Sequence, residues 1–231
     1  MSVPRRVAAA IILWAGVLWP GAAAAQIPAD LELVLAVDGS ASIDPAMLEL
    51  ELGGHAAAFR DPAVAAAVGG GYRGRIAVTL VRWSDPATLD VLVPWTLLAD
   101  ESSVRAFAAA IDAVPRRQSA GSTGIGAALL NAAALFRSSG VSAPRRVIDL
   151  VSNGYNNIGI LPEVARDRLV ADGIIINGLV ILDDVAWLAD YFADRVIGGP
   201  GAFVHRAEER SSFLHALLEK LKREIAQADV P

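Results

Sequence analysis

The sequence predicts an α/β protein in which helices cover both faces of a mostly parallel sheet. Short apolar runs alternate along the chain with longer Ala- and Leu-rich segments of helical spacing, and this alternation is typical of a parallel sheet. One pair of apolar runs is separated only by Ser84–Ala87, which is too short for a helical crossover and predicts an antiparallel hairpin. We therefore expect a Rossmann-like three-layer fold with six strands and one antiparallel strand at an edge.

The predicted strands are apolar runs that end at charged residues, Gly or Pro. In the first run, "LELVLAV", five of seven residues are large and aliphatic, as expected for a strand buried on both faces. The six strands are predicted at Leu31–Val37, Arg75–Trp83, Thr88–Val93, Arg146–Val151, Ile174–Leu182 and Ala202–His205.

The predicted helices are identified by their starting signals and by their apolar spacing. Asp44 and Pro45 form a capping residue followed by proline, which marks the start of a helix. Gly124–Phe136 is small and apolar nearly all round, which predicts a helix buried against the sheet. Further helices are predicted at Asp100–Val114, Pro162–Ala171 and Asp184–Val196, and the last one has a core stripe of Phe213, Leu214, Leu217, Leu218, Leu221 and Ile225.

Residues 1–25 have the order of a secretory signal peptide. Arg5 and Arg6 precede the apolar run Val7–Trp19, and small residues up to Ala25 follow it. The alternative is an uncleaved membrane anchor, but the run falls short of the roughly 20 residues that a spanning helix needs. We expect cleavage after Ala25, a single domain over 26–231 without a membrane span, and a periplasmic or secreted location.

The composition limits the classes of partner. Cleavage would change the formal charge from −5 to −7, and Lys220 and Lys222 are the only lysines. No basic patch is interleaved with aromatic residues, so nucleic acid is not an expected partner. The chain has no cysteine, so its stability outside the cytoplasm must come from core packing, with help from a ligand where one binds.

The segment "DGSAS" at Asp38–Ser42 is the first candidate site. It follows the predicted strand Leu31–Val37, and ligands of open α/β sheets bind beyond the carboxyl ends of the strands. A carboxylate and two hydroxyls are hard oxygen ligands, which suit Mg²⁺ or Mn²⁺ better than zinc. The alternative is a helix cap with polar turn residues.

The Asp-x-Ser-x-Ser pattern of Asp38, Ser40 and Ser42 resembles the metal-ion-dependent adhesion site of von Willebrand factor A domains (VWFA domains). The resemblance implies two further loops: "AGSTGIGAAL", which contains Thr123, and "RRVIDLVSNGYNNIG", which contains Asn153. It also implies that the strands Leu31–Val37 and Arg146–Val151 are neighbours in the sheet.

The likeness is closer to a bacterial group of exported A-domain proteins of uncharacterised function, and it covers essentially the whole mature chain. Eight blocks occur in order: "LVLAVDGSASIDP", "AAAFRDPAV", "RIAVTLVRWS", "VPWTLL", "GIGAAL", "RRVIDL", "INGLVIL" and "VIGGPGAFV". The third loop departs from the family pattern, because Asn153 stands where the family has aspartate. The amide can accept a hydrogen bond from a metal-bound water, but the lost charge should weaken metal affinity. A weaker metal site and a degenerate loop scaffold both remain open.

Enzymatic readings find little support. "AGSTGIGAAL" is similar to the glycine loop of short-chain dehydrogenases, but it lies mid-chain without a preceding strand and the chain lacks Tyr-x-x-x-Lys. There is no Gly-x-Ser-x-Gly elbow. Asp183 and Asp184 fit a helix cap better than a catalytic pair. The three histidines, His55, His205 and His215, are interpreted as surface or cap residues because they lack metal-ligand spacing.

We therefore expect a binding protein and not an enzyme. The resemblance implies that Asp38, Ser40, Ser42, Thr123 and Asn153 hold Mg²⁺ or Mn²⁺, and that the ion binds a protein ligand presenting Asp or Glu. The alternative is a metal-free structural or assembly factor of the cell envelope that uses the same fold.

Overall fold

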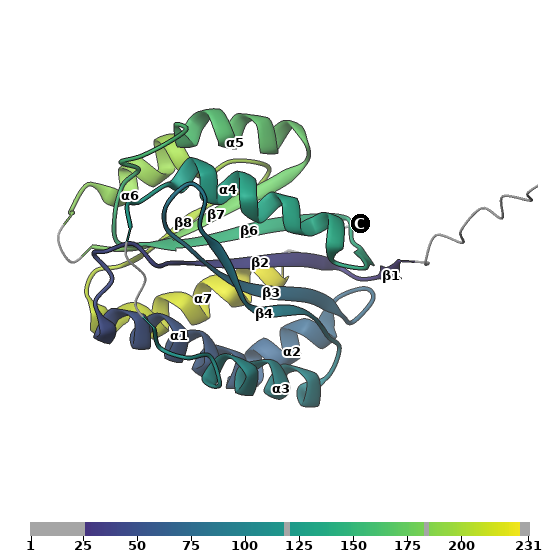
Figure 1. Cartoon of the computed structure of the whole chain (residues 1–231). Helices are drawn as coiled ribbons and strands as arrows, with labels where there is room; N and C mark the ends of the chain where they lie inside the picture. The colour runs from purple at the N-terminus through teal and green to yellow at the C-terminus, as the bar shows by residue number, and fades with distance from the viewer. Residues whose placement is uncertain (1–25, 118–120, 183–184, 227–231) are drawn as a thin grey trace, which may run out of the picture.

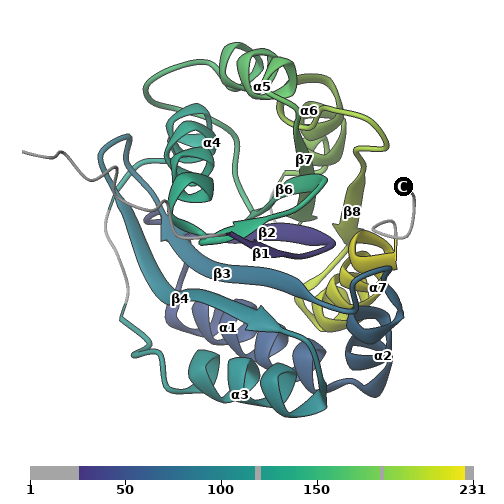
Figure 2. The ribbon, with the colours of Figure 1, turned by 90° about the vertical axis from the view of Figure 1, so that its right-hand side faces the viewer.

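A computed structural model describes residues 26–117, 121–182 and 185–226. It has three layers, with a central sheet between two groups of helices (Figure 1). The helices α1, α2, α3 and α7 cover one face, and α4, α5 and α6 cover the other (Figures 1 and 2). The predicted three-layer α/β fold is therefore confirmed, whereas the predicted signal peptide lies outside the described residues.

The main sheet has six strands in the order β4-β3-β2-β6-β7-β8. All neighbours are parallel except β3 and β4, which form the predicted antiparallel hairpin and place β4 at the edge. As the resemblance implied, β2 pairs directly with β6. The chain runs from β2 to β3 on one side of β2 and later returns from β4 to β6 on its other side. This reversal of strand order makes the carboxyl end of β2 the expected place for a ligand. The bounds are β2 (Leu31–Asp38), β3 (Ile76–Trp83), β4 (Leu89–Leu98), β6 (Arg145–Ser152), β7 (Ile174–Ile181) and β8 (Val204–Ala207).

A pair of short strands and one α-helix of the described chain were not predicted. A small parallel pair, β1 (Ile27–Pro28) and β5 (Val141–Ser142), lies at the end of the sheet where β2 begins. A second helix, α2 (Pro62–Gly70), follows α1 directly, and the Asp61 carboxylate caps it by accepting a hydrogen bond from the Ala63 amide at 2.8 Å. Asp61 and Pro62 repeat the capping signal of Asp44 and Pro45, so the sequence contained the information for this helix.

The helices otherwise follow their sequence signals. Asp44 caps α1 by accepting a hydrogen bond from the Met47 amide at 2.7 Å, and Asp100 caps α3 by accepting one from the Ser103 amide at 2.7 Å. The predicted helix Asp184–Val196 is shorter than expected, because α6 begins at Leu188 and a π-helical turn, η2, follows it. Asp183 and Asp184 lie outside the described residues. The bounds are α1 (Pro45–Arg60), α3 (Glu101–Asp112), α4 (Ile125–Ala134), η1 (Leu135–Ser138), α5 (Pro162–Ala171), α6 (Leu188–Tyr191), η2 (Phe192–Val196), η3 (Arg210–Ser212) and α7 (Phe213–Ala226).

The core of the described residues has two large apolar clusters, one on each face of the sheet, and a small third one of Ala29, Ala77 and Val141. Every residue of β2 is buried, so alternate residues contribute to opposite clusters. The predicted stripe of α7 packs into the cluster under α1 through Phe213, Leu217, Leu221 and Ile225, but Leu214 is 42% exposed. The helix therefore presents a neighbouring row, which contains the buried side chains of Lys220 and Glu224, to the interior.

His55 of α1 corrects the interpretation of the histidines as surface or cap residues. Its side chain is fully buried, and its ring Nδ1 lies 2.6 Å from the backbone oxygen of Glu51. Burial lowers the pKa of His55 to about 4, so the neutral ring is the form that the core accommodates at neutral pH. No spacing pattern around position 55 indicates a buried histidine.

Candidate cation site

Three loops meet at the end of the sheet away from β1 (Figure 1). The first follows β2, the second precedes α4 and the third follows β6. Because β2 and β6 are parallel neighbours, their carboxyl ends bring the first and third loops together. The structure thus assembles the predicted site residues from segments far apart in the sequence.

Asp38 is the buried charge of the first loop. Its Oδ1 accepts a hydrogen bond from the Ser40 amide at 2.7 Å, and its Oδ2 accepts one from the Ser152 hydroxyl at 2.6 Å. The side chain is completely buried, and this desolvation raises the pKa of Asp38 although the hydrogen bonds act to lower it. Among the described residues Asp38 forms no ion pair, and a bound cation would stabilise such a buried carboxylate.

Two serine hydroxyls connect Asp38 to the third loop. The Oγ atoms of Ser40 and Ser42 lie 3.1 Å apart, and the Ser42 hydroxyl donates to Asn153 Oδ1 at 3.0 Å. This turn needs glycine at position 39, because an added Cβ would lie 2.7 Å from the Cγ of Arg82 and 3.1 Å from the backbone oxygen of Trp83. The close approach to β3 therefore fixes where the two hydroxyls lie.

The second loop places Thr123 beside the third loop. Its amide donates to Asn157 Oδ1 at 2.9 Å, and the Asn157 amide donates back to the Thr123 backbone oxygen at 2.9 Å. A Cβ built on Gly154 would lie 3.7 Å from Thr123 Oγ1, so the hydroxyl is close to the third loop. Gly121 has a φ of 142°, which favours glycine.

The third loop is held by its own asparagines. Asn156 Oδ1 accepts from the Gly126 amide at 3.3 Å, and the Asn156 amide donates to the Tyr191 hydroxyl at 3.2 Å. Asn153 itself points its amide oxygen at Ser42. The predicted oxygen of this loop is therefore present at the site, but it belongs to a neutral side chain.

A pocket of about 290 Å³ opens where the loops meet, and Ser42, Thr123 and Asn153 line it together. Asp38 and Ser40 lie buried behind Ser42. The donor set consists only of oxygens, with one carboxylate, and this chemistry fits a hard divalent cation with reduced charge compensation. Over residues 26–117, 121–182 and 185–226, no group of three or more His, Cys, Asp or Glu side chains could hold a metal ion, so a cation here would depend on hydroxyl and amide oxygens.

Sequence reasoning missed several residues that shape the site. Ser152 donates the second hydrogen bond to Asp38, and Asp85 positions the second loop by accepting from the Ser122 amide at 2.7 Å. Tyr155 lines the pocket and forms an aromatic cluster with Trp187 and Tyr191, with ring centroids 5.3 to 6.5 Å apart. A hydroxyl or an acid within two residues of the end of a predicted core strand is the signal that could have identified Ser152 and Asp85.

Solved structures with the same architecture come from several sources. Proximal thread matrix protein 1 from the mussel byssus has a TM-score of 0.64 and 16% identity, over 87% of this chain and 48% of that chain. The pilus adhesin SpaC from Lactobacillus rhamnosus GG has a TM-score of 0.60 and 16% identity, over 88% of this chain and 30% of that one. The vWF domain of the type V pili tip protein Mfa5 from Porphyromonas gingivalis has a TM-score of 0.57 and 12% identity, over 89% and 97%.

The strand order, the helical layers and these likenesses define a von Willebrand factor A fold, as the sequence predicted. The chain spans less than half the length of the byssus and SpaC structures, and at these identities the likeness establishes the fold alone. No curated protein matches the sequence. The chain belongs to the family described as "Protein of unknown function (DUF1194)", whose model matches residues 28–229.

Proposed function

We propose that this protein is an exported binding protein that engages a protein ligand through a divalent cation. Mg²⁺ or Mn²⁺ would be held by Asp38, Ser40, Ser42 and Thr123, with Asn153 as a weaker contributor. The observation that carries the proposal is the convergence of oxygens from three loops on one pocket around a single buried carboxylate. No catalytic step is proposed, and the absence of enzymatic activity stays a prediction.

The cation would supply the charge that an acidic partner needs. The mature chain that we predict carries a formal charge of −7, so a partner that presents Asp or Glu would be repelled by the protein as a whole. A divalent ion between two carboxylates would bridge them. A structure of the byssus matrix protein has zinc in the corresponding adhesion motif, and adhesins and pilus tip proteins with this fold support an interaction role outside the cytoplasm.

The rim of the pocket offers apolar contact area beside the cation. Tyr155 is 47% exposed and Trp187 is 51% exposed, and their rings lie 5.3 Å apart. Aromatic side chains are enriched at the centres of protein interfaces. We therefore expect the partner to present an apolar side chain next to its carboxylate.

The second candidate is a metal-free structural or assembly factor of the cell envelope. The hydrogen bonds from Ser40 to Ser42 and from Ser42 to Asn153 favour it, because they connect the loops without a cation. The neutral side chain of Asn153 also favours the metal-free candidate, because it adds no charge that would attract a cation. Within residues 26–117, 121–182 and 185–226, none of the helices has the length and apolarity that crossing a membrane requires.

Affinity capture from a cell-envelope extract separates the two candidates. Residues 26–231 would be immobilised as wild type and as Asp38→Ala, and each would be washed with Mg²⁺ or with EDTA. We expect proteins that the wild type retains only with Mg²⁺ and that Asp38→Ala never retains. Proteins that both baits retain equally in Mg²⁺ and in EDTA, with none that requires both Mg²⁺ and Asp38, would reject the cation-dependent function and favour the metal-free one.

A further inference from the structure

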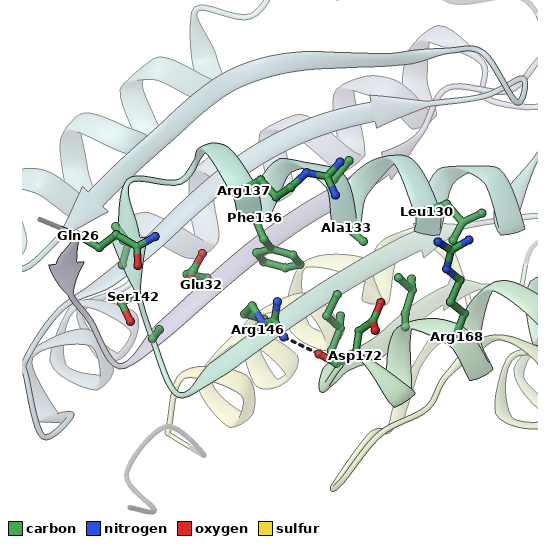
Figure 3. Close-up of a pocket in the computed structure, with 15 residues that line it drawn as sticks. Gln26, Glu32, Leu130, Ala133, Phe136, Arg137, Ser142, Arg146, Arg168 and Asp172 are labelled. Carbon is green, nitrogen blue, oxygen red and sulfur yellow. Dashed lines mark hydrogen bonds between the residues drawn. The ribbon is translucent and has the colours of Figure 1, made fainter. Parts of the chain in front are cut away.

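A second, larger pocket lies at the opposite end of the sheet, which faces the viewer in Figure 2. Its volume is about 710 Å³, within the range of about 300–1,000 Å³ that is typical of small-molecule sites. The beginnings of β2, β6 and β7 form its floor, and α4, η1 and the end of α5 form its sides (Figure 3). No residue of the candidate cation site lines it.

One end of the pocket is acidic. Glu32 of β2 is only 4% exposed, and its Oε2 has no hydrogen-bond partner among the described residues. Burial raises the pKa of this carboxyl, although Ser139, the backbone of Ala143 and the charge of Arg146 act to lower it. An unpartnered carboxylate oxygen in the wall of a pocket calls for a donor, and an ammonium group would also relieve the desolvation of the charge.

The pocket is basic from its middle, where Arg137 lies beside Phe136, to its other end, where Arg168 lies (Figure 3). Arg137 and Arg168 are exposed, and neither side chain has a hydrogen bond or an ion pair among residues 26–117, 121–182 and 185–226. In Figure 3, Arg168 lies at the far end of the pocket from Gln26, and Glu32 lies near Gln26. Two free guanidinium groups are suited to bind one carboxylate.

The wall between these ends combines apolar side chains with an arginine that is held in place. Arg146 donates to the backbone oxygen of Asp172 at 2.5 Å, and its guanidinium lies 6.0 Å from the centroid of the Phe136 ring. Arg146 is thereby held in the wall between the acidic and basic ends (Figure 3). Leu130, Leu169 and Ile174 add apolar surface to the same pocket.

We propose that this pocket binds a short peptide with both termini free. Its α-ammonium would meet Glu32, its α-carboxylate would meet Arg137 and Arg168, and an apolar side chain would pack against Phe136. A simple anion would leave Glu32 without a donor, and a simple cation would face three arginines with only Glu32 and Asp172 to attract it. A zwitterion of several residues satisfies both ends and suits the volume.

The test is a calorimetric titration of the tripeptide Ala-Leu-Ala into a protein of residues 26–231. The peptide is compared with its N-acetylated form and with its C-terminal amide. Because a hydrogen bond to a charged group contributes about 1.5–3 kcal/mol, blocking either end should weaken binding by about tenfold or more. Equal affinity for the three peptides, or binding to none of them, would overturn the proposal.

Two variants test which pocket residues bind the α-ammonium and the α-carboxylate of the peptide. Glu32→Gln should bind the free and N-acetylated peptides equally, and Arg168→Gln should reduce the difference between the free and amidated peptides. Arg105→Gln removes an exposed arginine on α3, which lies on the other face of the sheet, and should leave the whole pattern unchanged. If N-acetylation weakens peptide binding to the wild type and to Glu32→Gln by the same factor, the assigned role of Glu32 is wrong. This comparison holds even where the variant is less stable, because both peptides bind the same protein.

A final arm separates this pocket from the proposed cation site. Peptide affinity should be the same in Mg²⁺ and in EDTA, because no residue proposed to hold the cation lines the pocket. Binding that disappears in EDTA would place the peptide at the cation site and reject the present proposal. Failure of the cation-dependent function would leave the expected peptide pattern intact.

Discussion

Lys220 on α7 forms an ion pair with Asp149 on β6, and both side chains are completely buried. Lys220 also donates to Glu224, one turn later on the same helix, at 2.5 Å. Asn177 of β7 donates to the same carboxylate at 2.8 Å and accepts from the Phe203 amide at 3.1 Å. The last helix is thus attached to two central strands by charges inside an apolar layer, and each charge depends on the others for compensation.

Removing the cation of this cluster should destabilise the protein strongly. Lys220→Met would leave Asp149 and Glu224 as two buried acids without a positive partner, and loss of one member of a buried pair costs about 3–5 kcal/mol. Urea unfolding at neutral pH measures the change. Lys222→Met is the matched control, because Lys222 pairs with Glu219 at a partly exposed position and should change the free energy of unfolding by less than about 1 kcal/mol. Similar losses in both variants would show that the buried charge has no special role.

Glu224 should contribute to the pH dependence of the free energy of unfolding. Its pKa rises from an ordinary 4.5 to about 7, first because of burial and then because of the Asp149 charge. The folded state therefore holds this proton more tightly than the unfolded state. The resulting stabilisation is complete below pH 4.5 and is lost as the pH rises through about 7.

His55 acts in the opposite sense. Its pKa falls from 6.5 to about 4, so its contribution is present above pH 6.5 and is lost as the pH falls toward about 4. The contributions of Glu224 and His55 to stability therefore change with pH in opposite directions between pH 4.5 and 6.5.

In Glu224→Gln we expect the free energy of unfolding to fall less, from acid to neutral pH, than in the wild type. Glu219→Gln, an exposed acid of the same helix, should keep the wild-type profile, and an unchanged profile in Glu224→Gln would refute the assignment.

Much of the fold could be predicted because its central strands are apolar on both faces. β2 and β6 extend within one residue of their predicted limits, since a strand covered by helices needs apolar side chains throughout. The α7 helix shows the limit of this reasoning. An apolar stripe gives the general direction of the buried face, but Leu214 is exposed and Lys220 is buried because Asp149 of the sheet forms an ion pair with it. Asp149 lies within a predicted core strand, and such a buried acid was the signal in the sequence that a basic residue must be buried beside it.

The residues of the candidate site could be proposed from the sequence, but the residues that position them through hydrogen bonds could not. Ser40, Ser42 and Asn153 form one hydrogen-bonded series, and Thr123 lies beside it, as the resemblance implied. The contacts that fix their positions, from Ser152 to Asp38 and from Asp85 to the Ser122 amide, join elements distant in the sequence. Such contacts follow from the sheet order and not from any local pattern. Whether a cation binds here stays a prediction.

Metal binding should raise the stability of the protein through Asp38. Mg²⁺ at about 100 times its dissociation constant would stabilise the folded state by about 2.7 kcal/mol, and thermal unfolding with and without EDTA measures it. Asn153→Asp restores a second charge at a position 3.0 Å from Ser42 Oγ. A tenfold gain in affinity would add about 1.4 kcal/mol at the same metal concentration.

Two controls accompany the metal experiment. Asp38→Ala should abolish the shift, and Ser138→Asp, which adds a charge on the remote turn η1, should leave the wild-type shift unchanged. A wild type that is insensitive to Mg²⁺ and Mn²⁺, with Asn153→Asp equally insensitive, would mean that the site is a loop scaffold. A response in Asn153→Asp alone would show that the missing charge is what disables the natural site.

The turn at Gly39 should be intolerant of any side chain. A Cβ there would meet Arg82, whose guanidinium is held by Asp90 at 2.7 Å and by the Arg117 backbone oxygen at 2.5 Å, and it would approach the backbone of Trp83. Gly39→Ala must therefore displace the loop or the end of β3, and overpacking of this kind costs about 1–3 kcal/mol. Because the loop carries Ser40 and Ser42, we also expect a smaller stabilisation by Mg²⁺.

Gly69→Ala is the matched control for this change. Nothing lies within 4 Å of a Cβ at Gly69, which belongs to α2, so alanine there should be neutral or stabilising by up to about 1 kcal/mol. Urea unfolding of both variants, with and without Mg²⁺, makes the comparison. If Gly39→Ala were as stable as Gly69→Ala and responded equally to the metal, the close approach of the first loop to β3 could not be what positions its hydroxyls.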